Sequence, residues 1–448
     1  MRISKLSLYN FKKVNTLNIE IPSNSNIICF VGENGSNKSS IINTIYNTIR
    51  RYATEKSPSD IDDNYIQSTS IIGPDDDYCT FDVTISSEND IIIYSQASHI
   101  GQNAICDNSK EKLKTKYSER HFQNNEYFIN ELYFNDETYS SSWTLQNSLR
   151  DPIKNSIYLY RPSHRFELAP YEKEQGIDKP LPTSNTLGKR LFPYKVTSGI
   201  DEATNYLFSA LTDHFISTAN NTTPTYSLYQ YFFEIIRNVH PECEKLTVSA
   251  FPIRTISSKK MPSLDSLSAG QSDWLVTAFN ILAQASTLIS HNRDKYRNPH
   301  DIEGVVFIDE IDKNLHPKMQ EEVLPWFTSA FPNIQFIITT HSPWVIRSLP
   351  ESATVIKLPD GLDISDNYSY FNIDEITNKV FDRELGFSPQ VTELIKHFES
   401  LFENYSVNYN EILKIYREHS IKSESLKERL KRVILVKGGL ELVEAINA

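Results

Sequence analysis

Apolar and polar residues alternate along two segments near the start of the chain. Residues 16 to 21 alternate strictly and residues 2 to 9 more loosely, which predicts an antiparallel pair of strands joined around residues 10 to 13. The same period returns at residues 79 to 86 and 90 to 95, where it predicts a second hairpin. Strands of this kind indicate an antiparallel sheet with one face toward a core.

Later stretches are apolar without alternation. Such runs are typical of strands buried on both faces, as in a parallel sheet covered by helices. They lie at residues 27–31, 157–160, 304–308 and 333–340. Together with the alternating strands, they predict an α/β fold that combines a parallel sheet with an antiparallel lobe.

Apolar residues recur at helical spacing in two further regions. Residues 201 to 239 predict a helical insert, and the last hundred residues turn mainly helical after a strand at 353 to 358. We therefore expect a head at residues 1–350, with an insert of helices and strands at about 168–260. A mostly helical interaction module is expected at residues 351–448.

The composition narrows the class of protein. The chain has 448 residues and a formal net charge of −12, which argues against an overall basic nucleic-acid-binding surface. Lysine-rich segments at residues 108–120 and 422–437 favour solvated surfaces, and direct nucleic-acid contact stays open there as the alternative. The four cysteines form no C-x-x-C pair, and neither a signal peptide nor a membrane-spanning run is found. We expect a cytoplasmic protein without a membrane partner.

The apolar run at residues 27–31 leads into a loop with the spacing of a phosphate-binding motif. Lys38 is expected to reach the β- and γ-phosphates of a nucleotide, and the Ser39 hydroxyl to ligate Mg²⁺. Asn37 stands where the motif has its second glycine, and asparagine is the residue that best tolerates positive φ after glycine. The predicted phosphate-binding residues are Asn34, Gly35, Ser36, Asn37, Lys38, Ser39 and Ser40.

A second anion site is predicted before the helix that starts near residue 269. Ser268, or a residue near it, would be the N-cap of this helix, and Gly270 would permit close approach of the backbone to an anion. Gln271 completes the segment. An ordinary capped helix start is the alternative interpretation.

Acidic and polar residues follow three of the buried strands. Asp309 would hold Mg²⁺ through water, and Glu310 would orient or deprotonate the attacking water. His341 could hydrogen-bond the γ-phosphate, although a lone histidine there is usually structural. Arg165, or its neighbour His164, is the candidate for a side chain beside the γ-phosphate. An ordinary surface loop is the alternative, because it would show the same sequence pattern.

Two aromatic residues near the first predicted turn are candidates for the adenine site. Tyr9 or Phe11 could stack on the base, but an aromatic residue at the end of a strand is more often part of a core.

The order of these motifs resembles that of ABC-type ATPases. Residues 32–39 look like Walker A, residues 267–271 resemble the LSGGQ-type signature, and residues 306–310 look like Walker B with its glutamate. Residues 311–317 resemble the D-loop region, and residues 339–343 resemble the H-switch. The resemblance implies a P-loop NTPase with an ABC ATPase head, in which a RecA-like parallel sheet adjoins the antiparallel lobe.

The residues of these motifs are similar to those of the RecF, OLD and SMC-like branch of ABC-type ATPases. Within this branch they are similar to stand-alone antiphage-defence ATPases such as PtuA of Septu and retrons and AriA of PARIS. The resemblance implies that ATP and Mg²⁺ are bound and that a homodimer or higher oligomer forms through composite sites. Two departures, Asn37 and the lack of a clear Q-loop glutamine, imply slow hydrolysis or a nucleotide that mainly holds an assembly.

Two functions remain after these observations. The first is a defence ATPase that scaffolds, restrains or senses for a separately encoded nuclease-type effector, since the chain shows no nuclease pattern of its own. The alternative is a RecF-like DNA-repair ATPase that clamps DNA when ATP is bound, for which salt-dependent and ATP-dependent DNA binding would be diagnostic. The energy subunit of a transporter lacks support, because the insert and the tail do not match one.

Overall fold

A computed structural model describes most of the regions that carry the motifs. The described residues are 1–54, 78–86, 91–99, 126–127, 132–133, 139–146, 155–163, 194–195, 200–220, 228–241, 246–249, 255–291, 295–366, 368–381, 388–437 and 440–447. The basic segment at 108–120 and the candidates His164 and Arg165 lie outside these residues, so those predictions stay untested.

The antiparallel lobe begins with β1 (Arg2–Phe11) and β2 (Val14–Glu20), which pair as the sequence predicts. The predicted second hairpin is also confirmed, because β4 (Tyr78–Ser86) and β5 (Ile91–His99) pair antiparallel. The strand order is β2-β1-β4-β5-β8-β6, with β7 beside β8. The remaining strands of this sheet are β6 (Glu126–Tyr127), β7 (Leu132–Tyr133) and β8 (Tyr139–Gln146).

A second sheet has the order β10-β9-β13-β14-β3-β15-β16, and its pairings from β10 to β15 are parallel. The apolar runs of the sequence form its central strands, so the predicted α/β class is confirmed. The strands are β3 (Ile27–Val31), β9 (Ile157–Arg161), β10 (Tyr194–Lys195), β13 (Gly304–Ile308), β14 (Ile334–Thr339), β15 (Thr354–Lys357) and the antiparallel β16 (Leu362–Asp363).

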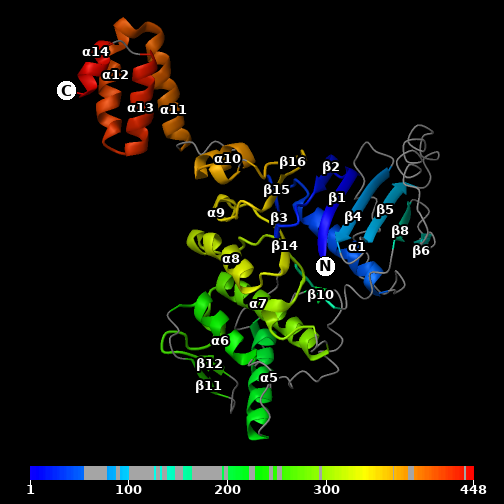
Figure 1. The fold of residues 1–448 in the computed structure, drawn as a ribbon. Coiled ribbons are helices and arrows are strands. Elements are labelled where there is room, and N and C mark those ends of the chain that lie inside the picture. Colours follow the sequence, from blue (N-terminus) through cyan, green and yellow to red (C-terminus); the bar gives the residue numbers. More distant parts are fainter. Residues whose placement is uncertain are drawn as a thin grey trace. The chain divides into compact units, whose positions relative to one another are not determined.

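Each face of the parallel sheet covers a different hydrophobic core. In β3, Cys29 and Val31 contribute to a core shared with helices α5 to α8, whereas Ile28 and Phe30 contribute to a core shared with α1 and the antiparallel lobe. Figure 1 shows these helices and the lobe gathered around the sheet. A central strand must therefore be apolar at every position, which explains the lack of alternation.

The helices of this region follow the predicted spacing. Two helices form where the sequence predicted a helical insert, α5 (Ile200–Ala219) and α6 (Leu228–Val239). The other helices are α1 (Lys38–Thr54), α7 (Ala269–His291), α8 (Pro317–Ala330), α9 (Pro343–Arg347) and α10 (Ile373–Phe381). A small two-stranded sheet consists of β11 (Thr247–Ser249) and β12 (Thr255–Ser257), and short 3-10 turns cover Leu264–Ser266, Pro299–Asp301 and Tyr368–Tyr370.

The chain divides into two compact units, Met1–Phe381 and Asp382–Ala448. The predicted boundary after residue 350 lies earlier than this division, because β15 pairs with β3 and so belongs to the sheet of the first unit. The second unit has a hydrophobic core of its own, with Phe398, Ile412 and Leu430 at its centre. Its helices are α11 (Pro389–Ser400), α12 (Tyr405–Ser420), α13 (Glu424–Lys437) and α14 (Leu440–Asn447), with a 3-10 turn at Leu401–Asn404.

Candidate nucleotide-binding site

The phosphate loop connects the end of β3 to the start of α1. Three of its residues have positive φ, namely Gly32 (139°), Gly35 (78°) and Asn37 (70°). Asn37 thus adopts the left-handed conformation that its position in the motif requires, as expected for an asparagine in place of glycine. A side chain at Gly32 would collide with the main chain, because its Cβ would lie 2.3 Å from the Leu358 carbonyl oxygen.

Lys38 is held inside this loop. Its side chain is 4% exposed, and its Nζ donates hydrogen bonds to the carbonyl oxygens of Gly32 (2.9 Å) and Glu33 (2.8 Å) and to Ser36 Oγ (3.1 Å). Burial lowers the pKa of Lys38 to about 8, although the nearby Asp309 carboxylate acts in the opposite direction. The loop therefore positions a cation whose charge is poorly solvated.

Ser39 connects the loop to the carboxyl end of β13. Its Oγ donates to Asp309 Oδ1 over 2.9 Å, and Asp309 is 1% exposed. A hydroxyl and a carboxylate at this distance are hard oxygen ligands of the kind that Mg²⁺ prefers. The described residues contain no cluster of three or more His, Cys, Asp or Glu side chains suited to a metal ion. Ser39 and Asp309 are the residues of this group that would hold a magnesium ion.

Thr339, at the end of β14, links the two acidic residues. Its hydroxyl donates to Asp309 Oδ1 (2.6 Å) and accepts a hydrogen bond from the Glu310 backbone N–H (2.7 Å). Glu310 has a φ of 51°, a conformation that is uncommon for a residue with a side chain. The hydrogen bond from its backbone supports this conformation at the edge of the sheet.

His341 follows β14 at the same edge. Its backbone N–H donates to Asp312 Oδ1 (3.3 Å), which also accepts a hydrogen bond from Thr340 Oγ1 (2.6 Å). Burial lowers the pKa of the His341 imidazole, and the Lys38 charge lowers it further. The neutral imidazole is therefore favoured near neutral pH.

The buried amide of Asn37 tests whether the loop fits a phosphate. Its Nδ2 has no hydrogen-bond partner among the described residues. Buried donors are rarely left unpaired, and a phosphate oxygen at the loop would supply an acceptor. Together with the Lys38 ammonium and the N-terminus of α1, this donor makes the loop suited to an anion.

The predicted second anion segment forms the start of α7. Ser268 is exposed, and its Oγ accepts a hydrogen bond from the Gln271 backbone N–H (3.3 Å), as an N-cap does. The Gln271 side-chain oxygen accepts in return from the Ser268 backbone N–H (3.1 Å). Gly270 lies against the loop after β13, since its Cβ would be 2.4 Å from the Asn314 carbonyl oxygen. The start of α7 therefore packs on the chain at Gly270 and leaves Ser268 exposed at the surface.

The structure thus joins Ser39 to Asp309 by a hydrogen bond and holds Lys38 in the same loop, near enough for the Asp309 charge to affect its pKa, with Glu310 and His341 at the same sheet edge. Phe11 is different: it is fully buried, and its ring lies 5.9 Å from that of Phe81, so stacking on adenine is wrong for this residue. β1 belongs to the antiparallel lobe, and Phe81 on the neighbouring β4 packs against the Phe11 ring.

Other residues of the site were not predicted. Lys12 Nζ donates to Ser40 Oγ (2.7 Å), and Lys13 Nζ lies 3.7 Å from the position of a Cβ on Gly35. Their position in the predicted turn between β1 and β2 could have indicated a place at the site, because that turn lies over the phosphate loop. Thr339 could not be recognised, since one threonine at the end of a strand is common.

Comparisons with known families support a nucleotide-binding fold. Residues 5–208 match the model "AAA domain", and residues 263–347 match "AAA domain, putative AbiEii toxin, Type IV TA system". A structure titled "Crystal structure of the SmcHead bound to the C-winged helix domain of ScpA" is 14% identical, with a TM-score of 0.42, covering 81% of this chain and 96% of that chain.

Relatives of the chain include named ATPases. The "Retron Vc95 probable ATPase" of Vibrio cholerae is 24% identical, covering 94% of this chain and 88% of the relative. The "Retron Ec83 probable ATPase" of Escherichia coli is 36% identical over 27% of this chain and 22% of the relative. "Septu protein PtuA" of Bacillus mycoides is 31% identical over 29% of this chain and 19% of that protein. The chain therefore resembles retron proteins named as probable ATPases and, over part of its length, Septu protein PtuA.

No helix in the described part of the chain is long and apolar enough to cross a membrane.

Proposed function

Because the chain is related to retron and Septu ATPases, we propose that it binds ATP with Mg²⁺ at the phosphate loop and hydrolyses it. The observation that carries this proposal is that one loop holds the buried Lys38 cation and Ser39, whose hydroxyl donates a hydrogen bond to the Asp309 carboxylate. Lys38 contacts the β- and γ-phosphates, and Ser39 and Asp309 hold Mg²⁺, which neutralises phosphate charge when bound.

Glu310 and His341 act on the γ-phosphate side. Glu310 orients and deprotonates the attacking water, and its backbone bond to Thr339 keeps the carboxylate at the strand end. His341, held near Asp312 through its backbone, donates a hydrogen bond to the γ-phosphate. Its lowered pKa leaves one ring nitrogen as a donor and the other as an acceptor.

The site is completed by a second copy of the chain. Ser268 is exposed at the N-terminus of the 23-residue helix α7, where backbone N–H groups and the helix dipole favour an anion. In the proposed homodimer or higher oligomer, Ser268, Gly270 and Gln271 of one copy contact the phosphates bound by the other. ATP then favours the associated state, and hydrolysis releases it.

In the cell, we place the protein in the cytoplasm as the ATPase component of an antiphage system. Its relatives are named after retrons and Septu, which supports this assignment. The helical unit at residues 382–448 serves as the interaction module for a separately encoded nuclease-type effector, and the chain itself has no nuclease activity. Its exposed apolar side chains Val407 and Val436 are available for such contacts.

Two substitutions test the site. Lys38→Ala should abolish nucleotide binding, because it removes the buried cation, whereas Glu310→Gln should keep binding and accumulate the ATP-bound oligomer. Binding is measured with a fluorescent ATP analogue and assembly by analytical ultracentrifugation. Lys5→Ala is a matched control, since Lys5 is a lysine of β1 whose partner is the exposed Glu20. Equal ATP affinity of the wild type and Lys38→Ala would refute the proposed function.

A further inference from the structure

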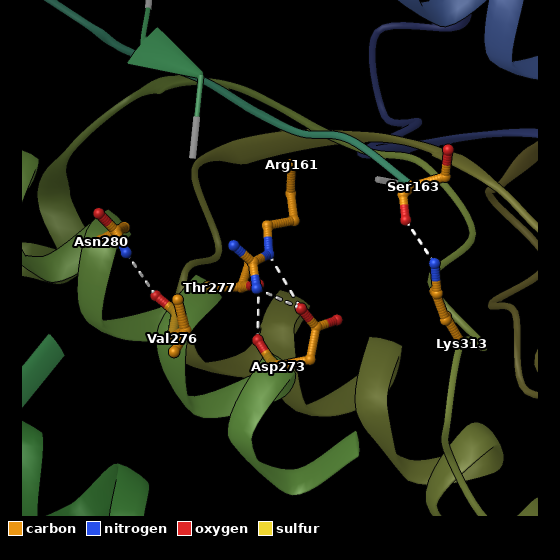
Figure 2. Close-up of polar contacts among 7 residues, drawn as sticks. All are labelled: Arg161, Ser163, Asp273, Val276, Thr277, Asn280 and Lys313. Carbon is orange, nitrogen blue, oxygen red and sulfur yellow. Dashed lines mark hydrogen bonds and ion pairs between the residues drawn. The ribbon is translucent and has the colours of Figure 1, made fainter. Parts of the chain in front are cut away.

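An ion pair between the buried Arg161 and the partly buried Asp273 joins the end of β9 to the first turns of α7. Arg161 is 1% exposed, and its Nε and Nη2 donate to Asp273 Oδ1 over 2.9 Å and 2.5 Å. Figure 2 shows the Arg161 side chain extending from the strand toward the helix, where it meets the Asp273 carboxylate. Two donors of one guanidinium on a carboxylate define both the distance and the orientation of the helix.

The main chain of the same arginine contacts the nucleotide site. The Arg161 carbonyl oxygen accepts a hydrogen bond from the Asp309 backbone N–H over 2.9 Å. Arg161 therefore joins two elements, with its backbone on the residue proposed to hold Mg²⁺ and its side chain on the helix that begins with Ser268. A displacement at the end of β13 would reach α7 through one residue.

Neighbouring contacts reinforce the connection between these segments. Lys313 Nζ donates to the Ser163 carbonyl oxygen, so the loop after β13 is tied to the segment that leaves β9 (Figure 2). The same loop packs on the start of α7, because the Asn314 carbonyl oxygen occupies the space where a side chain on Gly270 would lie. The end of β9, the loop after Glu310 and the start of α7 thus form one contiguous cluster.

Two buried polar residues of α7 bond within the helix. Thr277 Oγ1 donates to the Asp273 carbonyl oxygen (2.8 Å), and Asn280 Nδ2 donates to the Val276 carbonyl oxygen (2.8 Å). Both side chains are almost fully buried, yet these bonds do not connect α7 to the sheet. The contrast makes Thr277 a suitable control for Asp273.

We propose that Arg161 and Asp273 are positioning residues that couple the nucleotide-binding edge of the sheet to the N-terminus of α7. The ion pair transmits the presence of the nucleotide at Asp309 to Ser268 and Gly270, which contact the second copy of the chain. This inference rests on the proposed function, since it assigns a role to the surface that completes the composite site. Both residues are assigned as positioning residues, which act through the segments that they join.

The test separates nucleotide binding from assembly. Asp273→Asn preserves the shape of the side chain and removes its charge, so the affinity for a fluorescent ATP analogue should stay within about twofold of the wild type. ATP-dependent self-association should weaken about tenfold, the size typical of a lost coupling between sites. Asp273→Glu should restore part of the association, and Thr277→Val should leave both quantities unchanged.

Parallel losses of nucleotide affinity and association in Asp273→Asn would overturn the proposal, because they would show a merely structural role. Wild-type association in a folded Asp273→Asn variant would overturn it as well. A second measurement covers the case in which Asp273→Asn does not fold. Hydrogen exchange of the wild-type amides at residues 268–272 should slow when the ATP analogue binds, at protein concentrations where no oligomer forms, and Thr277→Val should show the same slowing.

Unchanged exchange at these amides would also refute the coupling. Different results would refute the proposed function. These are normal ATP binding by Lys38→Ala, or a wild-type protein that does not self-associate when ATP is present. The exchange measurement needs no second copy, so it tests the coupling even if no oligomer forms.

Discussion

Raising the pH above about 8 should weaken ATP binding through Lys38. Burial lowers the pKa of this lysine from an ordinary 10.5 to about 8 in the nucleotide-free protein, so its charge is lost over an accessible range. Phosphate oxygens beside the ammonium favour the charged form, and ATP binding therefore requires uptake of a proton wherever free Lys38 is neutral. With a pKa of about 8, the affinity should fall about 25-fold between about pH 7.5 and about pH 9.5.

The stability of the nucleotide-free protein should change in the opposite direction. The folded pKa of Lys38 lies below its unfolded value, so the unfolded chain binds more protons between about pH 8 and 10.5. The destabilisation from the buried charge is fully present below about pH 8 and is relieved as the pH rises through this window. Lys38 therefore contributes rising stability and falling ATP affinity over the same range, which separates its titration from general alkaline unfolding.

Calorimetric titration with ATP in two buffers of different ionisation enthalpy measures the proton directly. At about pH 8.5, about three-quarters of a proton should be taken up per ATP bound. Lys5→Ala should show the same uptake, whereas any residual binding by Lys38→Arg should show none from this position, because arginine stays charged. An affinity independent of pH from 7.5 to 9.5, with no proton taken up, would refute the assigned burial and role of Lys38.

Three further substitutions test particular contacts. Phe11→Ala should lower the free energy of unfolding by about 3–5 kcal/mol in denaturant melts, since it empties a buried site; a change in preference for ATP over GTP without loss of stability would contradict its place in the core. Gly270→Ala should weaken ATP-dependent association and leave the nucleotide affinity of the unassociated chain unchanged, because its Cβ would meet a carbonyl oxygen at 2.4 Å and displace the start of α7; normal association would count against the packing. Thr339→Val should reduce kcat by roughly tenfold, as it removes the hydroxyl bonded to Asp309 and to the Glu310 backbone; steady-state phosphate release with unchanged kcat would exclude this role.

Much of the sheet could be predicted from the apolar pattern, because burial on two faces leaves a direct mark on each strand. The runs that became β3, β13 and β14 are apolar throughout, and the glycine and lysine spacing after β3 identifies the phosphate loop. The position of Asn37 was also informative, since its φ of 70° follows from the geometry that the motif requires.

Contacts between distant segments could not be predicted in the same way. Nothing near Arg161 indicates that its partner lies at residue 273, because the pair forms only when β9 and α7 pack together. The same reason explains Phe11, whose ring packs on Phe81 of the neighbouring strand β4, a pairing that the sequence pattern does not reveal. The sequence also predicted the strand that forms β15, but not its pairing with β3, which makes it part of the first unit. Alternation and apolar runs indicate that a strand forms and do not indicate its partner.

The phosphate loop and the sheet edge beside it contain several energetically unfavourable features. The Lys38 charge is buried, the Asn37 amide has no partner among the described residues, and Glu310 has a positive φ. A phosphate group would stabilise the first two directly, because it supplies negative charge and acceptors where the loop already holds donors. Donors held in place before binding lose little entropy when the ligand arrives, so the free energy gained on binding is available for other changes. In this chain the segment after Glu310 is placed to undergo such a change. It contacts α7 at Gly270, and Lys313 connects it to the segment after β9. The loop proposed to bind ATP and the helix start proposed to meet a second copy are therefore linked by contacts that the fold has already formed.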